Sequence, residues 1–171
     1  MIGIQGIGVY IPSLRNSNFD RMEQFEMSER FIREKIGFTS LSQKAPDVET
    51  SELCLLAWED LKNSHSISAD EVDCLVVCTQ NPDGHGLPHT SAIVHQKLGL
   101  SNDCAVFDIS LGCSGFAYGL SVIQSFMETN GMQNGLLFTA DPYSKVIDRD
   151  DKKTATLFGD GATVTWLGTN P

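Results

Sequence analysis

Apolar residues along this 171-residue chain occur alternately in short continuous runs and in stripes with helical spacing. A short apolar run is typical of a buried strand, whereas apolar residues that recur every three to four positions are typical of a helix. The pattern predicts strands over residues 2–10, 73–79, 104–109 and 135–140. It predicts helices over residues 28–35, 49–63 and 88–98, and a further helix after residue 113.

The helix after residue 113 carries Phe116, Leu120, Ile123 and Met127 on one stripe, with small residues filling much of its opposite side. A helix without a polar face is expected to be enclosed by close neighbours rather than exposed.

Two further strands are predicted over residues 154–158 and 162–167, joined by Gly159-Asp160-Gly161 as an antiparallel pair at an edge of the sheet. Alternation of strands and helices implies a mostly parallel sheet with helices on both faces. We therefore expect residues 1–171 to form one layered α/β domain with a mixed, mostly parallel sheet.

Composition and charge exclude several classes of protein. The net charge of −10 argues against nucleic-acid binding, because phosphates would not be neutralised. No apolar run reaches the length needed to span a membrane, and the N-terminus has no basic start followed by an apolar stretch, so neither a membrane span nor a signal peptide is expected. Five cysteines form an odd set, mostly inside apolar segments, which suits reduced thiols in the cytoplasm.

Cys113 is the candidate with the clearest chemistry, because it follows a strand-like run and is predicted to lie in the first turn of a helix. Helix N-termini have unpaired backbone N–H groups and a partial positive charge, which favour a thiolate. The same N–H groups can stabilise the oxyanion that forms when a thioester is attacked. These residues therefore predict an enzyme that forms an acyl-cysteine intermediate on Cys113.

Other motifs have plainer explanations. Cys74 and Cys78 lie on one face of a strand, as core residues do, and no Cys-x-x-Cys pair suggests a metal site. His89 and His95 are six residues apart and do not share a helix face, so no metal site is expected from the histidines. The glycines near the N-terminus do not form the dinucleotide-binding fingerprint.

Two motifs occur together in this chain: Asp108-Ile109-Ser110-Leu111-Gly112-Cys113-Ser114-Gly115-Phe116 and Leu157-Phe158-Gly159-Asp160-Gly161-Ala162. With the opening segment 6–12 and the segment 28–37, they make the chain resemble the beta-ketoacyl-acyl carrier protein synthase III family, which are condensing enzymes of the thiolase superfamily. The resemblance covers only the N-terminal half of that fold. It implies a thiolase-like half that bears the nucleophile, with the activating histidine and asparagine in a C-terminal half that is absent here.

The resemblance also implies roles for individual residues. Cys113 would take an acyl group from a thioester, and a malonyl-type extender would then lose carbon dioxide and attack the acyl-cysteine in a decarboxylative Claisen condensation. Phe31 and Lys152 match positions that stack the adenine of coenzyme A, where the family often has tryptophan and arginine. Leu87 matches a residue that borders the acyl pocket across a dimer.

The implied substrates are acyl-coenzyme A or acyl-acyl carrier protein, with no cofactor and no metal, in fatty acid biosynthesis. The implied partners are acyl carrier protein, a second copy in a homodimer, and the missing C-terminal half. Arg30, Arg33 and Lys35 are candidates for contacts with the acidic carrier protein. The isolated chain is expected to fall short of full turnover.

Two alternatives remain open from the sequence. The same scaffold could transfer the acyl group to an oxygen, nitrogen or sulfur acceptor, or the chain could be a non-catalytic partner half. An α/β-hydrolase with a cysteine elbow is disfavoured because Leu111 stands where its Gly-x-Cys-x-Gly motif requires glycine.

Overall fold

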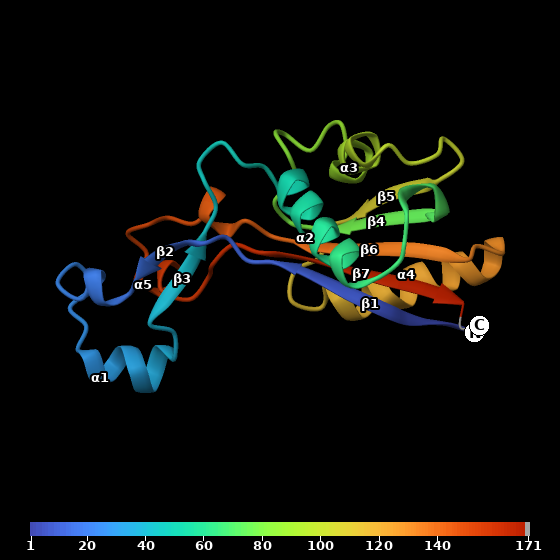
Figure 1. Cartoon of the computed structure of the whole chain (residues 1–171). Helices are drawn as coiled ribbons and strands as arrows, with labels where there is room; N and C mark the ends of the chain where they lie inside the picture. The colour runs from blue at the N-terminus through green and yellow to red at the C-terminus, as the bar shows by residue number, and fades with distance from the viewer. Residues whose placement is uncertain (170–171) are drawn as a thin grey trace. The chain divides into compact units, whose positions relative to one another are not determined.

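The computed structural model describes residues 1–169 and divides into two compact units (Figure 1). Unit 1 contains residues 1–10, 49–141 and those from 162 on, and unit 2 contains residues 11–48 and 142–161. Each unit is thus assembled from segments that are distant in the sequence.

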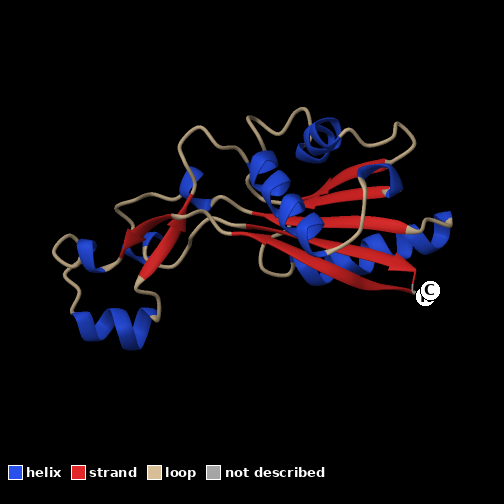
Figure 2. Ribbon diagram, viewed as in Figure 1, coloured by secondary structure: helices blue, strands red, loops and turns tan. Residues whose placement is uncertain are grey.

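Unit 1 contains a five-stranded mixed sheet with the strand order β1-β7-β6-β4-β5 (Figure 2). The strands are β1 (Ile2–Tyr10), β4 (Cys74–Cys78), β5 (Ala105–Ile109), β6 (Asn134–Ala140) and β7 (Ala162–Thr169). β4 pairs in parallel with β5 and β6, while β7 runs antiparallel to both β1 and β6. The layered α/β fold with a mixed, mostly parallel sheet is confirmed.

Helices cover both faces of this sheet. Figures 1 and 2 show α2 (Thr50–Ser64) and α3 (Thr90–Leu98) on one face and α4 (Gly115–Asn130) on the other. A short 3₁₀ turn at Ala69–Glu71 lies between α2 and β4 in the sequence. Among the described residues, no helix combines the length and apolar character needed to cross a lipid bilayer.

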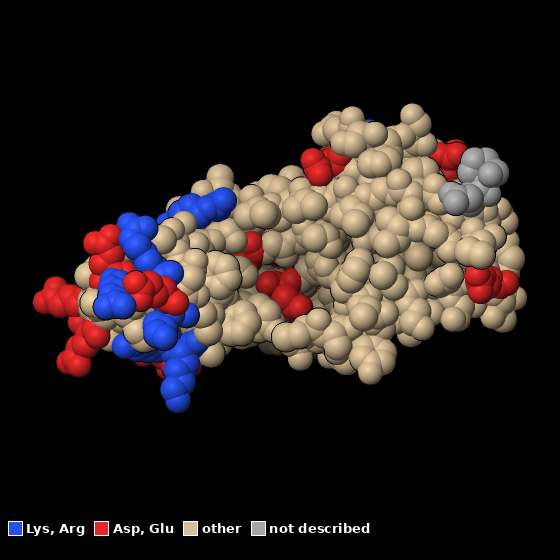
Figure 3. Space-filling view, turned by 90° about the horizontal axis from the view of Figure 1, so that it is seen from below, with Lys and Arg blue, Asp and Glu red and all other residues tan. Residues whose placement is uncertain are grey.

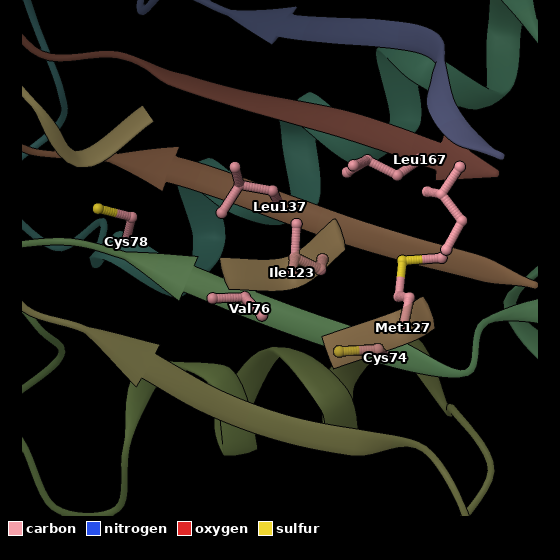
Figure 4. Close-up of a cluster of buried hydrophobic side chains, with 8 residues drawn as sticks. Cys74, Val76, Cys78, Ile123, Met127, Leu137 and Leu167 are labelled. Atoms are coloured by element: carbon pink, nitrogen blue, oxygen red, sulfur yellow. The ribbon is translucent and has the colours of Figure 1, made fainter. Parts of the chain in front are cut away.

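The core beneath α4 is apolar and fully enclosed. Figure 4 shows the side chains that meet between the sheet and this helix: Cys74, Val76 and Cys78 of β4, Ile123 and Met127 of α4, Leu137 of β6 and Leu167 of β7. Burying such side chains stabilises the fold by about 1.5–3 kcal/mol each.

The buried face of α4 is narrower than the sequence pattern predicts. Gly115, Gly119, Ile123 and Met127, spaced four residues apart, face the sheet, whereas Phe116 remains 41% exposed. The glycines allow close approach, since a Cβ on Gly119 would lie 2.9 Å from a methyl group of Leu137. The expectation that α4 is enclosed all round is wrong for the described chain, because nothing in it covers the outer side of the helix.

Unit 2 is smaller and is built around a two-stranded antiparallel sheet. Its elements are β2 (Leu14–Ser17), η1 (Phe19–Arg21), α1 (Glu29–Phe31), the π-helical η2 (Ile32–Ile36), β3 (Ser40–Gln43), η4 (Tyr143–Lys145) and α5 (Lys152–Ala155). The hydroxyl of Ser28 caps α1 by accepting from the Phe31 N–H at 3.2 Å. Gly37 ends the helical segment with a φ of +82°, which glycine adopts without strain.

The prediction of a strand over residues 154–158 is wrong. The Asp151 carboxylate accepts from the Lys153 N–H at 3.1 Å and from the Thr154 hydroxyl at 2.7 Å, and this cap starts the short helix α5 instead. β7 therefore has no hairpin partner at 154–158. It lies between β1 and β6 rather than at an edge of the sheet.

Asp160, from the Gly-Asp-Gly segment, organises unit 2. Its buried carboxylate accepts from the Lys44 N–H at 2.8 Å, the Ser144 N–H at 2.9 Å and the Ser144 hydroxyl at 2.5 Å. The Ser42 hydroxyl also donates to the Asp160 carbonyl at 2.5 Å. A buried carboxylate needs such donors, so the aspartate of this motif joins β3 to the segment 142–161.

Candidate active site

Cys113 lies at the carboxyl end of β5, in the turn directly before α4, and its side chain is exposed. The sequence placed it in the first turn of the helix. The structure places Cys113 two residues before the first residue of α4, in a turn. In this turn the Gly115 N–H donates to the Gly112 carbonyl at 2.7 Å. The N-cap Ser114 makes no side-chain capping bond, so the N–H groups of Phe116 and Ala117 have no side-chain cap. Those donors suit an anion that forms next to the sulfur.

Two glycines hold the cysteine turn against β4 and the residues that follow it. A Cβ on Gly115 would overlap the sulfur of Cys78, and a Cβ on Gly112 would lie 2.6 Å from the side-chain oxygen of Gln80. The Cys78 thiol also donates to the Leu111 carbonyl at 3.4 Å. A side chain at either position would require Cys78 or Gln80 to move, so these glycines let the backbone beside Cys113 pass close to both residues.

Asp108 anchors the strand that leads to Cys113. Its carboxylate accepts from the N–H groups of Thr90 at 2.9 Å and Ser91 at 2.8 Å, at the start of α3. A carboxylate at a helix N-terminus satisfies unpaired donors and is favoured by the helix dipole. We did not single out Asp108 from the sequence, because its partners are some 17 residues away.

Burial separates the other four cysteines from Cys113. Cys54, Cys74, Cys78 and Cys104 are all buried. Desolvation by burial raises the pKa of each, to about 12 for Cys74 and about 11 for Cys104. These four behave as core residues, and Cys113 is the one exposed cysteine of the five.

Three of the histidines have separate partners. His89 lies 3.9 Å from the Asp108 carboxylate, His95 contacts the Ser101 carbonyl at 2.9 Å, and His65 packs edge-on against Trp166. Over residues 1–169, no group of three or more His, Cys, Asp or Glu side chains is arranged to hold a metal ion.

Phe31 and Lys152, which are 121 positions apart in the sequence, come together in unit 2. The Lys152 ammonium lies 5.0 Å from the centre of the Phe31 ring and donates to the Phe25 carbonyl at 2.8 Å. This is a cation–π contact. The Lys152 ammonium lies over one face of the Phe31 ring. A ligand ring that stacked between the two side chains would have to occupy this same face.

Leu87 is 79% exposed and lies in the loop between β4 and α3 of unit 1. Its assignment to an acyl pocket remains a prediction.

Comparison with known proteins points to one family. The family model of 3-oxoacyl-[acyl-carrier-protein (ACP)] synthase III matches residues 107–170, which include Cys113 and the Gly-Asp-Gly segment. The beta-ketoacyl-[acyl-carrier-protein] synthase III of Neisseria meningitidis is 33% identical over 93% of this chain and 49% of its own length. That of Caldanaerobacter subterraneus subsp. tengcongensis is 37% identical over 97% of this chain and 50% of its own length.

Solved structures agree. A crystal structure of a 3-oxoacyl-(acyl-carrier-protein) synthase III superposes on 99% of the chain with a TM-score of 0.93 and 32% identity, and the match covers 50% of that protein. The enzyme from Thermus thermophilus gives a TM-score of 0.91, also with 32% identity, over 99% of this chain and 52% of its own. The chain spans about half the length of the curated relatives it matches. The resemblance to the N-terminal half of this family, with its thiolase-like fold, is confirmed.

Proposed function

We propose that this chain, which matches the N-terminal half of beta-ketoacyl-[acyl-carrier-protein] synthase III in sequence and fold, carries the nucleophile of a decarboxylating condensing enzyme. The observation that supports this most directly is the exposed Cys113, held by glycines at the junction of β5 and α4. Phe31, Leu87 and Lys152 are proposed as residues that contact the substrate.

In the first step, the Cys113 thiolate attacks the carbonyl carbon of an acyl thioester. The carbonyl oxygen becomes an oxyanion, and backbone N–H donors at the start of α4 can stabilise it. The carbon–sulfur bond to the carrier then breaks. The carrier leaves as a thiolate that takes up the proton released from Cys113, and the acyl group remains on the cysteine. This step consumes an acyl thioester and needs no cofactor.

In the second step, the carbon–carboxylate bond of a malonyl-type thioester breaks, carbon dioxide leaves, and the electron pair forms an enolate. The enolate carbon bonds to the acyl carbon, the carbon–sulfur bond to Cys113 breaks, and Cys113 leaves as a thiolate while the 3-oxoacyl group remains on the thioester of the extender. Donors are needed at the enolate oxygen during this step. In our proposal, a histidine and an asparagine from outside this chain supply them. The chain by itself is therefore expected to accept an acyl group without condensing it.

Intact-mass spectrometry tests both halves of this proposal. The chain is incubated with an acyl thioester and then with a malonyl thioester. One acyl adduct per chain is expected, and it should persist when the malonyl thioester is added. A chain that gains no acyl group would contradict the nucleophile role. A condensed product formed without added protein would contradict the proposed division of labour.

The contact between Phe31 and Lys152 supports an acyl group delivered on a carrier protein rather than on coenzyme A. Phenylalanine has a smaller face than tryptophan, and lysine lacks the planar guanidinium that stacks on rings. Replacing the pair by the stacking pair of the family, in the double variant F31W/K152R, is expected to lower the acyl-coenzyme A concentration needed for half-maximal loading about tenfold, equivalent to about 1.4 kcal/mol. Loading from acyl-acyl carrier protein should change less than twofold. Equal responses with both donors would contradict adenine stacking at this pair.

Charge is distributed unevenly between the two units. Unit 2 carries ten of the twelve Lys and Arg residues and ten of the 22 Asp and Glu residues, so unit 1 accounts for the whole net charge of −10. In the view of Figure 3, most of the visible basic side chains lie on unit 2. An acidic carrier protein would therefore meet less repulsion at unit 2. Arg30 and Arg33 are already paired with Glu34 and Glu29 on their own helix, which leaves Lys35 as the most available of the three proposed contacts.

Apolar side chains on the outer side of α4 are exposed, which supports the proposal that a further protein surface covers them. Two helices cover one face of the five-stranded sheet of unit 1, but only α4 covers the other. Gly8 faces α2, so its neighbours Ile7 and Val9 point to the α4 side, where they are about half exposed. Phe116 and Val122 of α4 are exposed to a similar degree. Figure 3 shows few charges on the face of unit 1 turned toward the viewer.

We propose that the remaining half of the family fold covers this apolar face, and that the isolated chain associates through it. Sedimentation velocity over a wide concentration range should show association, and V122K should weaken it. A chain that stays monomeric at all concentrations would contradict this proposal. The homodimer expected for the family is a separate proposal.

A further inference from the structure

Two arginines that are far apart in the sequence line one cavity of unit 2. Arg21 lies in η1, and Arg149 lies in the loop before α5. The cavity between them is open to solvent and has a volume of about 30 Å³. This is room for two or three water molecules or one small polar group. Its other polar side chains are Asn16, Ser42, Gln43 and Ser144.

The residues that line this cavity do not balance its positive charge. No Asp or Glu is among its described lining residues, and neither arginine takes part in an ion pair within residues 1–169. The carboxylates next to Arg149 in the sequence have other partners: Asp150 accepts from the Gln24 amide, and Asp148 accepts from the Asp150 N–H. Asp160 lies behind Ser144, but four backbone and side-chain interactions already engage it.

The Arg21 guanidinium is held in place by a hydrogen bond and is affected by the charge of Arg149. One of its N–H groups donates to the Ala155 carbonyl, which leaves other donors of its planar fork for a ligand. Partial burial, and then the positive charge of Arg149, lower the pKa of Arg21. Arginine nevertheless stays protonated in proteins, so two like charges line the same cavity. An anion with several oxygens would remove this repulsion.

We propose that Arg21 and Arg149 form a binding site for a phosphate-type oxyanion. Guanidinium groups bind phosphate oxygens through paired N–H bonds. Gln43 adds an amide at the rim, since its oxygen accepts from the Asn16 amide and its own NH₂ group remains available to donate. The apolar lining residues Leu41, Ile147 and Phe158 limit water around the bound group. The site lies within unit 2, is separate from Cys113, and does not depend on the proposed acyl chemistry.

Titration of the chain with inorganic phosphate tests the site, at constant ionic strength maintained with sodium chloride. Arginine side-chain N–H signals are followed by NMR. Saturable shifts of the Arg21 and Arg149 signals are expected. R149Q should weaken phosphate binding about tenfold, the effect of losing one charge-assisted contact. R149K should weaken it less, because the charge remains while the planar fork is lost.

Lys153 supplies a matched control. It is an exposed cation four residues from Arg149 and does not line the cavity. K153Q removes the same charge and should leave phosphate affinity unchanged within twofold. Equal weakening by K153Q and R149Q, or shifts that never saturate, would overturn the site. R21Q is less informative, because it also removes the bond to the Ala155 carbonyl.

A second titration, with 4′-phosphopantetheine, distinguishes the source of the phosphate. Binding at least tenfold tighter than that of inorganic phosphate would assign the site to the phosphate of a thioester carrier. Equal affinity would assign it to free phosphate. Either result supports the oxyanion site, and failure of both ligands to bind would overturn it. Because neither titration requires acyl transfer, failure here leaves the role of Cys113 untouched.

Discussion

Replacing Cys113 with alanine is expected to abolish acyl loading, lowering the rate at least about 10³-fold and to the limit of detection by intact mass. The alanine side chain cannot form a thioester. The other four thiols cannot substitute, because they are buried and their burial raises the pKa of each. The measurement is the adduct mass after incubation with an acyl thioester at neutral pH.

A cysteine outside the proposed site supplies the control for this prediction. Cys104 is buried just before β5, and C104A should keep the wild-type adduct. Peptide mapping should place the adduct on Cys113. An adduct that survives in C113A would show that another residue is the nucleophile, and the condensing-enzyme proposal would then be wrong.

Replacing Gly8 with alanine should cause the largest loss of stability among the simple substitutions in β1. A Cβ at Gly8 would lie 2.6 Å from the Leu61 backbone nitrogen and would also overlap the Ala57 carbonyl oxygen. These atoms belong to the backbone of α2, so the helix itself would have to move off the sheet. Overpacking of this kind should lower the free energy of unfolding by about 2–3 kcal/mol. The melting temperature should fall by about 5–10 °C.

Gly3 lies in the same strand and serves as the matched control, because a Cβ there would meet no atom within 4 Å. G3A should therefore change the melting temperature by less than about 2 °C. Thermal unfolding followed by circular dichroism measures both variants. Equal destabilisation by G3A and G8A would show that a general sensitivity of β1, rather than the contact with α2, sets the cost.

Local patterns in the sequence were sufficient for most elements of the fold. The apolar runs at residues 73–79 and 104–109 became β4 and β5, and the helical stripe from residue 49 became α2. Ser28 and Gly37 bounded their helical segment as expected. Such features arise from interactions between residues close in the chain, so a single sequence carries enough information to predict them.

The errors have both local and long-range causes. The segment 154–158 has an apolar, strand-like composition, but the side chain of Asp151 starts a helix there. β7 lies inside the sheet because it pairs with β1, more than 150 residues earlier in the chain. Phe116 is exposed because Gly115 and Gly119, rather than the large apolar side chains, bring α4 close to the sheet.

By itself the sequence determined that the thiol follows a strand and lies near the start of a helix, and it supplied the motifs that link the chain to its family. Those properties depend on residue type and local spacing. Only the tertiary structure decided that Lys152 lies over Phe31 and that Arg21 and Arg149 share a cavity. The members of each pair are more than 100 residues apart, and side chains this distant meet only when the folded backbone brings them together.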